Sequence, residues 1–344
     1  MTIKSQTLII ATMLLMLACN KKESIKNDEA AVTKDTISQI DSIQNGEGPR
    51  TESINLFTLT WKDSTDVAFV SLSDIYPFNP ENNESLMLPD IKKMEKKDAE
   101  FFRLENNYRK RFLSQTNISE TDSVFVYDYA KNKLASFSVK NLKTAALLNG
   151  YTSTEEWPYN PSDYMIGFEI SKQSLKDFTE YYSDVLVCVG KENPFTGEQL
   201  TQIVWKKVAE NEFPSKAIKK EDQKILKDKI AGNVYSFKTK SFDYFIRDYF
   251  SDDSKDVFAH RLIVLDSNTK KVIIENLYSQ SEGTTPAPLN NQNPDDNVEQ
   301  YTGRLFKNKP PVVFGFLYQS FGCPSIEIID KSNEFIYLQC DNRH

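Results

Sequence analysis

The sequence CPSIEIIDKSNEFIYLQC, residues 323–340, contains two apolar runs on either side of the polar tetrapeptide DKSN. β-Branched and aromatic residues are frequent in both runs, and Asp, Ser and Asn favour turns, so the stretch is predicted to form an antiparallel hairpin. A loop of four residues, 330–333, would set the register of the two strands. The expected pairs are Ile329 with Glu334, Ile328 with Phe335, Ile326 with Tyr337, and Cys323 with Cys340.

The two cysteines of this hairpin, Cys323 and Cys340, are predicted to form a disulfide. Residues opposed at a non-hydrogen-bonded position have α-carbons about 4.5 Å apart, which a disulfide can span. Closing a loop of this size stabilises a fold by about 3 kcal/mol in the chain-entropy treatment. The alternatives are two reduced thiols, or a metal pair with His344 as a further ligand. Cys188 lies in the apolar run VLVCV and is expected to be a buried, unreactive thiol.

Outward from this hairpin, much of the chain beyond residue 54 has the composition of strands. The chain contains 22 Phe and 16 Tyr but only 11 Gly, and this balance favours packed sheets. Segments rich in β-branched and aromatic residues on either side of a polar break predict hairpins, and apolar runs predict single strands, of which 185–189 should be central. The expected hairpins are 56–61 with 66–72, 123–129 with 134–139, and 260–265 with 271–278; the expected single strands are 164–170 and 185–189.

Helical spacing of apolar residues is less common. Residues 89–113 are predicted to form an amphipathic helix, residues 142–148 a short helix, and the sequence after Ser174 another short helix. The aromatic residues of 242–250 fit either a helix or a strand, and a helix is preferred. The expected fold class is therefore α+β: β-rich, with mostly antiparallel sheets and a few amphipathic helices.

The N-terminal sequence LLMLACNKK, residues 14–22, places one cysteine where an apolar run ends and charge begins. The run from residue 8 to residue 18 is about 11 residues long, whereas a membrane-spanning helix needs roughly 20. A basic residue, a short apolar core and a small residue before Cys19 indicate a secretory signal peptide, residues 1–18.

This segment resembles the lipobox of bacterial lipoproteins, in which a cysteine follows Leu, a small residue and Gly or Ala. The four residues here are Met16, Leu17, Ala18 and Cys19, so the first two differ from the usual pattern. The resemblance covers the first 19 residues and implies cleavage before Cys19, acylation of this cysteine with fatty acids such as palmitate, and a place in the cell envelope. Two or three acyl chains anchor a protein stably, whereas a single chain does so only marginally.

Residues 19–53 are polar and charged and are predicted to form a disordered tether. Lys21, Lys22 and Glu23 loosely resemble the export signal of surface lipoproteins of Bacteroidota, which would imply the outer membrane; a solvated linker without an address is the alternative. Two lobes are expected beyond the tether, an α+β lobe at 54–210 and a β-rich lobe at 233–344. The two lobes could also form one domain.

The composition argues against several classes of function. The formal net charge is −7, so the chain offers no basic field for a nucleic acid partner. No glycine-rich phosphate loop, His-Glu-x-x-His, Cys-x-x-Cys or Gly-x-Ser-x-Gly motif occurs, and no cofactor, metal or catalytic residue is assigned. Oxygen-bearing side chains alternate in 291–299, but the glycine and the spacing of a calcium-binding EF-hand are missing.

Three residues are candidates for ligand binding. Trp157 and Tyr159 lie in the proline-punctuated sequence WPYNP, where aromatic side chains are expected to be exposed. His344 lies in the polar sequence DNRH, close to the predicted disulfide.

The interpretation that follows is a cell-envelope lipoprotein, most simply a non-enzymatic module that binds a protein or glycan partner. One alternative is a membrane-tethered hydrolase that acts on polysaccharide or peptide through a carboxylate pair. Another is an assembly or protective factor whose surface blocks a partner. A shallow aromatic surface would favour the binding module, and a deep cleft with two converging acids would favour the hydrolase.

Overall fold

The structure is a computed structural model of the 344-residue chain. It describes residues 54–62, 65–76, 87–179, 184–251, 256–290, 300–320 and 322–341. Cys19, the signal peptide and the tether predicted from the sequence lie outside these residues, as do His344 and residues 291–299. Residues Glu52–His344 form one compact unit.

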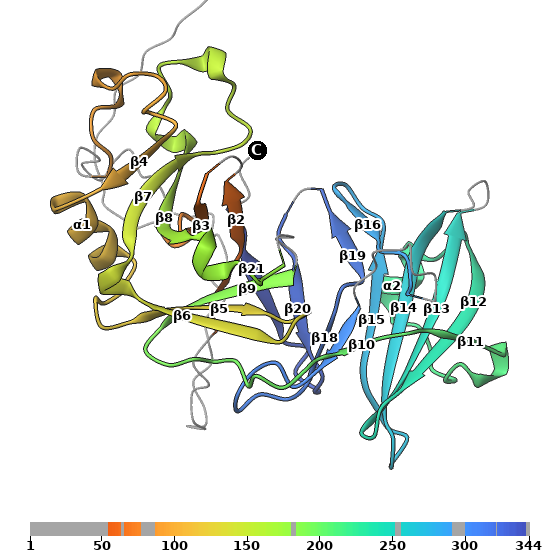
Figure 1. Cartoon of the computed structure of the whole chain (residues 1–344). Coiled ribbons are helices and arrows are strands. Elements are labelled where there is room, and N and C mark those ends of the chain that lie inside the picture. The colour runs from red at the N-terminus through yellow and green to blue at the C-terminus, as the bar shows by residue number, and fades with distance from the viewer. Residues whose placement is uncertain are drawn as a thin grey trace, which may run out of the picture. The chain divides into compact units, whose positions relative to one another are not determined.

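The largest sheet of this unit, called the central sheet here, has nine strands (Figure 1). Its neighbouring strands are antiparallel, except that β1 (Leu56–Phe57) runs parallel to β21 (Phe335–Gln339). The order across the sheet is β10 (Thr201–Gln202), β17 (Tyr301–Gly303), β18 (Val312–Phe314), β20 (Ser325–Ile328), β21, β1, β9 (Val185–Gly190), β5 (Ser123–Asp128) and β6 (Lys133–Ser138).

A second, five-stranded sheet, called the N-terminal sheet, is fully antiparallel. Its order is β2 (Leu59–Lys62), β3 (Val67–Ser71), β8 (Tyr164–Ser171), β7 (Lys143–Leu148) and β4 (Phe101–Leu104). The chain passes from β1 of the central sheet to β2 of this sheet through Thr58 alone. In β8, a Cβ added at Gly167 would lie 1.8 Å from the carbonyl oxygen of Val70, so this close approach of β8 to β3 requires glycine.

A third sheet, the C-terminal sheet, is an antiparallel meander of five strands. Its strands are β11 (Lys206–Val208), β12 (Lys229–Lys238), β13 (Phe242–Ser251), β14 (Val257–Asp266) and β15 (Val272–Ser279). A two-stranded ladder of β16 (Thr284–Pro286) and β19 (Leu317–Gln319) accompanies it.

Helices are few in the described part of the chain. The α-helices there are α1 (Asn107–Gln115) and α2 (Lys220–Ile225). Short 3₁₀ helices form at Ile91–Lys93, Val139–Asn141, Thr154–Glu156, Pro161–Asp163, Lys172–Leu175 and Glu210–Glu212. None of the helices described is long and apolar enough to cross a membrane.

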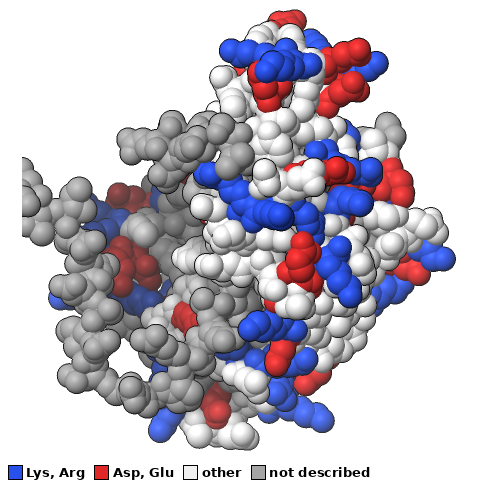
Figure 2. Space-filling model, turned by 90° about the vertical axis from the view of Figure 1, so that its left-hand side faces the viewer, with Lys and Arg blue, Asp and Glu red and all other residues white. Residues whose placement is uncertain are grey.

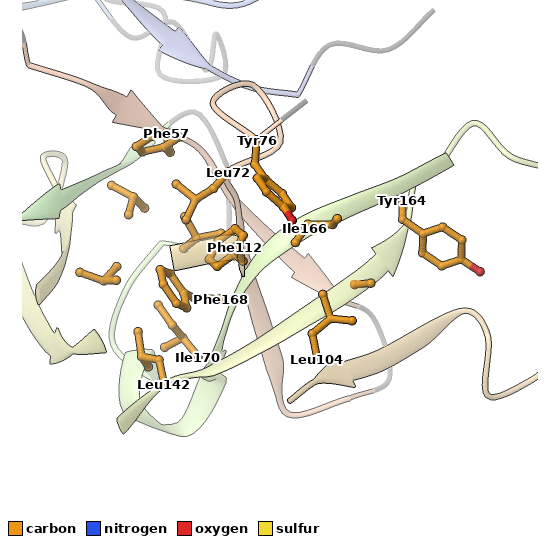
Figure 3. Close-up of a cluster of buried hydrophobic side chains, with 14 of the residues drawn as sticks. Phe57, Leu72, Tyr76, Leu104, Phe112, Leu142, Tyr164, Ile166, Phe168 and Ile170 are labelled. Carbon is orange, nitrogen blue, oxygen red and sulfur yellow. The ribbon is translucent and has the colours of Figure 1, made fainter. Parts of the chain in front are cut away.

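Apolar cores on both faces of the central sheet hold these layers together. The first core lies between the N-terminal sheet and one face of the central sheet, and α1 adds Phe112, whose ring meets that of Phe168 edge-on at 5.4 Å (Figure 3). The second core covers the opposite face with Phe195, Leu305 and Phe306. A third core joins the C-terminal sheet to β18 and the end of β20.

The structure confirms a β-rich, mostly antiparallel fold and several of the predicted elements. The hairpins at 123–139 and 260–278 are β5–β6 and β14–β15, and 185–189 falls in β9, an interior strand of the central sheet. The hairpin predicted at 56–72 is confirmed only for β2 and β3, because β1 pairs with β9 and β21 instead.

The predicted helices are mostly wrong, so "a few amphipathic helices" overstates the helical part of the fold. Residues 89–113 contain a 3₁₀ turn, β4 and the start of α1 in place of one long helix. Residues 142–148 and 242–250 are strands β7 and β13, each in the interior of its sheet. The short helix predicted after Ser174 is not found in the described residues 176–179; a 3₁₀ helix, Lys172–Leu175, ends there instead.

The hairpin at 323–340 forms, but its register is shifted by one residue from the prediction. Ser325 pairs with Tyr337, Ile326 with Ile336, and Glu327 with Phe335, because the loop holds five residues, from Ile329 to Asn333. Cys323 and Cys340 are therefore offset, and they lie beyond the last ladder bond. They still form the disulfide, with α-carbons 5.5 Å apart. Cys188 is a free, buried cysteine, and burial raises its pKa to about 11.

Candidate functional site

The surface most open to a partner is one face of β21. Tyr337 points from this interior strand and is 63% exposed, and Phe335 on the same face is half-buried. Gln339 follows on that face, and Ser325 of β20 lies opposite Tyr337. These four residues are called the β21 face below. A single exposed apolar residue is ordinary, but two neighbouring aromatic side chains on one open face form a small patch that a partner could cover.

The register of the central sheet explains why this face is uncovered. Paired residues lie on the same side of a sheet, so Phe57, Glu327 and Val313 share a side with the β21 face. Phe57 is buried under the N-terminal sheet, and Val313 is buried under the C-terminal sheet. β20 and β21 lie between these two covering layers (Figure 1), so the described residues leave a strip of the central sheet open.

The two aromatic rings of the β21 face form a platform. The ring centroids of Phe335 and Tyr337 are 6.3 Å apart, with 31° between the ring planes. Ser325 and Gln339 beside them are polar and uncharged, and they can donate and accept hydrogen bonds. Tyr318, on the nearby strand β19, is 50% exposed. The face thus offers flat apolar surface together with neutral hydrogen-bonding groups.

Two links hold β21 in place. The disulfide from Cys340 to Cys323 ties its end to the start of β20. Beyond it, the Asp341 carboxylate accepts a hydrogen bond of 2.6 Å from the Ser71 hydroxyl, and the Asp341 amide donates to Asp74 at 2.8 Å. Because these contacts join β21 to both β20 and the end of β3, the platform rests on a rigid support.

Beside the β21 face, Glu327 is the centre of a buried polar cluster. Glu327 lies opposite Phe335, and only 2% of its surface is exposed. Tyr278 of β15 donates a hydrogen bond of 2.6 Å to Oε2, and the Asn276 amide donates to Oε1. Burial raises the pKa of Glu327 to about 7, although both donors and the charge of Lys219 oppose the shift.

A second buried polar pair lies in the C-terminal sheet. It joins Asp248 on β13 to His260 on β14, the strand beside β15. Nδ1 of His260 is 2.9 Å from Asp248, and Nε2 is 3.0 Å from the carbonyl oxygen of Ala287. A carbonyl oxygen only accepts, so Nε2 carries a hydrogen. The pair joins β13 to β14 and, through Ala287, to the residue after β16.

A shallow hollow of about 420 Å³ lies at the start of α1. It is lined by Pro89, Arg103, Glu105, Asn106, Asn107 and Tyr108. Arg103 is held by a bidentate ion pair with Glu169, and Glu105 is the sole acid in the lining, so this hollow does not present two converging acids. On the side of the molecule seen in Figure 2, basic and acidic side chains are interspersed, so neither sign of charge dominates.

The aromatic residues predicted from the sequence as ligand-binding lie elsewhere. Trp157 and Tyr159 meet edge-on, with ring centroids 5.2 Å apart. The expectation that this loop exposes its aromatic residues is wrong for Tyr159, which is 3% exposed in the first core, while Trp157 is half-buried against that core. The peptide bond between Trp157 and Pro158 is cis. The structure does not bring these residues to the β21 face.

The β21 face was not anticipated from the sequence, although a signal for it exists. In EFIYLQ, residues 334–339, the aliphatic Ile336 and Leu338 alternate with Phe335, Tyr337 and Gln339. The first set faces the second core, and the other set forms the open face. A strand whose residues are aliphatic on one side and aromatic or polar on the other is the sequence pattern that could have indicated this open face.

Comparison with known proteins gives no relative from which a role could be transferred. No family, no curated protein and no solved structure matches this chain. Within the described ranges, no group of three or more His, Cys, Asp or Glu residues could hold a metal ion. The functional argument therefore rests on the geometry of the β21 face.

Proposed function

We propose that this protein is a lipid-anchored binding protein of the bacterial cell envelope that recognises a neutral glycan through the β21 face. The observation that carries the proposal is the exposed pair of Phe335 and Tyr337 on an interior strand. The faces of aromatic rings stack on the C–H faces of sugar rings, because the π-face is electron-rich. Ser325 and Gln339 supply uncharged donors and acceptors of the kind that sugar hydroxyl groups require.

The proposed place of action follows from the N-terminal sequence. Acylation of Cys19 with palmitate and related fatty acids would hold the chain on a membrane, most simply the outer membrane, on its periplasmic or surface side. Residues 19–53 would then separate the folded part from the bilayer. The disulfide between Cys323 and Cys340 supports an extracytoplasmic place, because disulfides persist in oxidising compartments.

A binding role accounts for the geometry better than the hydrolase alternative. An acid-catalysed glycosidase needs two carboxyl groups about 5 to 10 Å apart around the scissile bond. The β21 face has no carboxylate of its own, and the neighbouring Glu327 is buried, with both oxygens engaged by Tyr278 and Asn276. This surface is therefore suited to holding a ligand rather than to cleaving it.

The test uses the full-length protein in native gels that contain a soluble β-glucan, a xylan, a mannan or a starch. At least one polysaccharide should retard the protein, and Tyr337→Ala should weaken the affinity tenfold or more, which corresponds to about 1.4 kcal/mol. Tyr151→Ala is the matched control, because Tyr151 is 71% exposed in a loop away from the β21 face.

Two results would overturn the proposal. One is that none of the four polysaccharides retards the protein, or that Tyr337→Ala binds as tightly as the wild type. The other is that a photo-crosslinking residue at position 337 captures one envelope protein in cells and that Tyr337→Ala abolishes its binding. That outcome would assign the β21 face to a protein partner.

A further inference from the structure

The seam between the C-terminal sheet and the central sheet contains a titratable group with no ion-pair partner in direct contact. Glu327 on β20 reaches Tyr278 and Asn276 on β15, so its carboxyl group joins a strand of one sheet to a strand of the other. The third core fills much of this seam with apolar side chains such as Leu262 and Val264. A buried hydrogen bond of 2.7 Å also crosses it, between the hydroxyl groups of Tyr244 on β13 and Thr302 on β17.

The groups that face Glu327 identify what its charge meets. Tyr278 of β15 is the titratable group in contact with Glu327. Lys219, in the segment before α2, attracts the Glu327 carboxylate at longer range, and its ammonium group donates a hydrogen bond to the Glu275 carbonyl oxygen. β18 and β21 place the uncharged Val313 and Phe335 beside it. His260 lies one strand farther, on β14, where it pairs with Tyr278, and Asp248 lies on β13 beyond it.

We infer that Glu327 is a proton-dependent clasp between β15 and β20, which is closed when the carboxyl group holds a proton and loosens when the proton leaves. A protonated carboxyl group fits this seam, because it is neutral and can still share hydrogen bonds with Tyr278 and Asn276. A carboxylate there is separated from water and has only neutral donors in contact. Any opening that hydrates the group is therefore favoured once it is ionised.

The consequence is a protein whose two sheets are joined more firmly at mildly acidic pH. The pKa of Glu327 is raised from an ordinary 4.5 to about 7, so the change of charge falls near neutral pH. The inference does not depend on the proposed function, because it concerns the seam and not the ligand. Glu327 lies directly opposite Phe335 of the β21 face in the ladder of β20 and β21.

The experiment is hydrogen exchange of the backbone amides of β15 and β20 in the full-length protein at pH 5.5 and pH 8.0, after correction for intrinsic rates. Proton linkage with these pKa values predicts that the opening equilibrium rises about 30-fold between the two conditions. Glu327→Gln should remove this pH response, because the amide stays neutral. The control Glu334→Gln, an exposed position in the same hairpin, should keep it.

A second measurement covers the case in which Glu327→Gln does not fold. The ¹³C signal of the Glu327 carboxyl group in the wild type should titrate near pH 7, and Tyr278→Phe should raise the midpoint, because the lost hydroxyl donor stabilises the carboxylate. A wild-type midpoint below about 5.5, equal exchange protection at both pH values, or a full pH response in Glu327→Gln would each overturn the inference.

Discussion

The hydroxyl group of Tyr278 lies 2.6 Å from Oε2 of Glu327. Together with the bond from Asn276 to Oε1, it connects the edge strand of the C-terminal sheet with an interior strand of the central sheet. Tyr278 is itself fixed by stacking on Phe316, with ring centroids 4.7 Å apart. Burial and the neighbouring Glu327 raise the pKa of Tyr278, so the phenol keeps its proton and remains a donor.

Global stability should fall as the pH rises from 5 to 8. The folded pKa of Glu327, about 7, is above its ordinary value, so the folded state binds more protons than the unfolded state between about pH 4.5 and 7. The free energy of unfolding should decrease by about 2 to 3 kcal/mol across this range. Urea unfolding at half-unit pH intervals measures it. A free energy that is flat or rises over the same interval would contradict the assignment.

Carboxylates with lowered pKa values act outside this range. Arg109 donates to Glu120 and holds its pKa below the ordinary value, so the stability from that pair is lost only as the pH falls below about 4.5. The decline from pH 5 to 8 can therefore be separated from acid unfolding in one series of measurements.

Replacement of Tyr278 by Phe should destabilise the protein more at pH 8 than at pH 5.5. A hydrogen bond to a charged acceptor contributes about 1.5 to 3 kcal/mol, and one to a neutral acceptor about 0.5 to 1.5 kcal/mol. Tyr318→Phe, at a half-exposed position on β19, should change the free energy of unfolding by less than about 0.5 kcal/mol at either pH. An equal loss for Tyr278→Phe at both pH values would show that Glu327 does not change its charge in this range.

Removal of the disulfide should lower stability without disturbing the central core. The double variant Cys323→Ser with Cys340→Ser should lose about 3 kcal/mol in urea unfolding, because the bridge closes a loop across 17 residues of sequence. A thiol assay on the denatured, non-reduced wild type should detect Cys188 alone if Cys19 carries lipid. Three or more reactive thiols would refute the disulfide, and two would point to an unmodified Cys19.

Gly167→Ala should be strongly destabilising. The added methyl group would lie 1.8 Å from the Val70 carbonyl oxygen, so β3 and β8 would have to separate, with a loss of about 3 kcal/mol or more. Gly150→Ala is the matched control, since no atom lies within 4 Å of a Cβ there, and its effect should stay within about 1 kcal/mol. Thermal unfolding of both variants measures the difference, and equal melting temperatures would contradict the close packing of β8.

Cys19→Ser should release the protein from membranes. The side chain that accepts the acyl chains is lost, so palmitate labelling should disappear and the protein should move to the soluble fraction. Lys21→Ser is a nearby control that should leave labelling intact. Continued palmitate incorporation by Cys19→Ser would refute the proposed anchor.

Sequence patterns predicted the elements whose partners are close in the chain. β14 and β15 are apolar runs on either side of a polar turn from Asp266 to Lys270, so both the strands and their pairing could be predicted locally. The predictions of helices at 142–148 and 242–250 were wrong for a physical reason. Residues 144–147 of β7 are all buried, as are residues 243–246 of β13, and such strands lose the two-residue alternation by which a strand is recognised.

The register of the 323–340 hairpin was missed because one apolar residue has another partner. Ile329 was counted as the last strand residue, but its side chain belongs to the third core and its amide bonds to Pro311. The open face of β21 was missed for a similar reason. Whether Tyr337 is covered depends on the positions of two sheets that are distant in sequence, and no local pattern contains that information.

The placement of β1 has a mechanical consequence. The chain enters the folded unit at a strand that is hydrogen-bonded on both sides, to β9 and to β21. If the membrane anchor is at Cys19, a pull on it would act along β1 and load both ladders in shear at once, so the bonds would have to fail together. Force on the anchor would then be borne by the interior of the central sheet and not by a fraying edge.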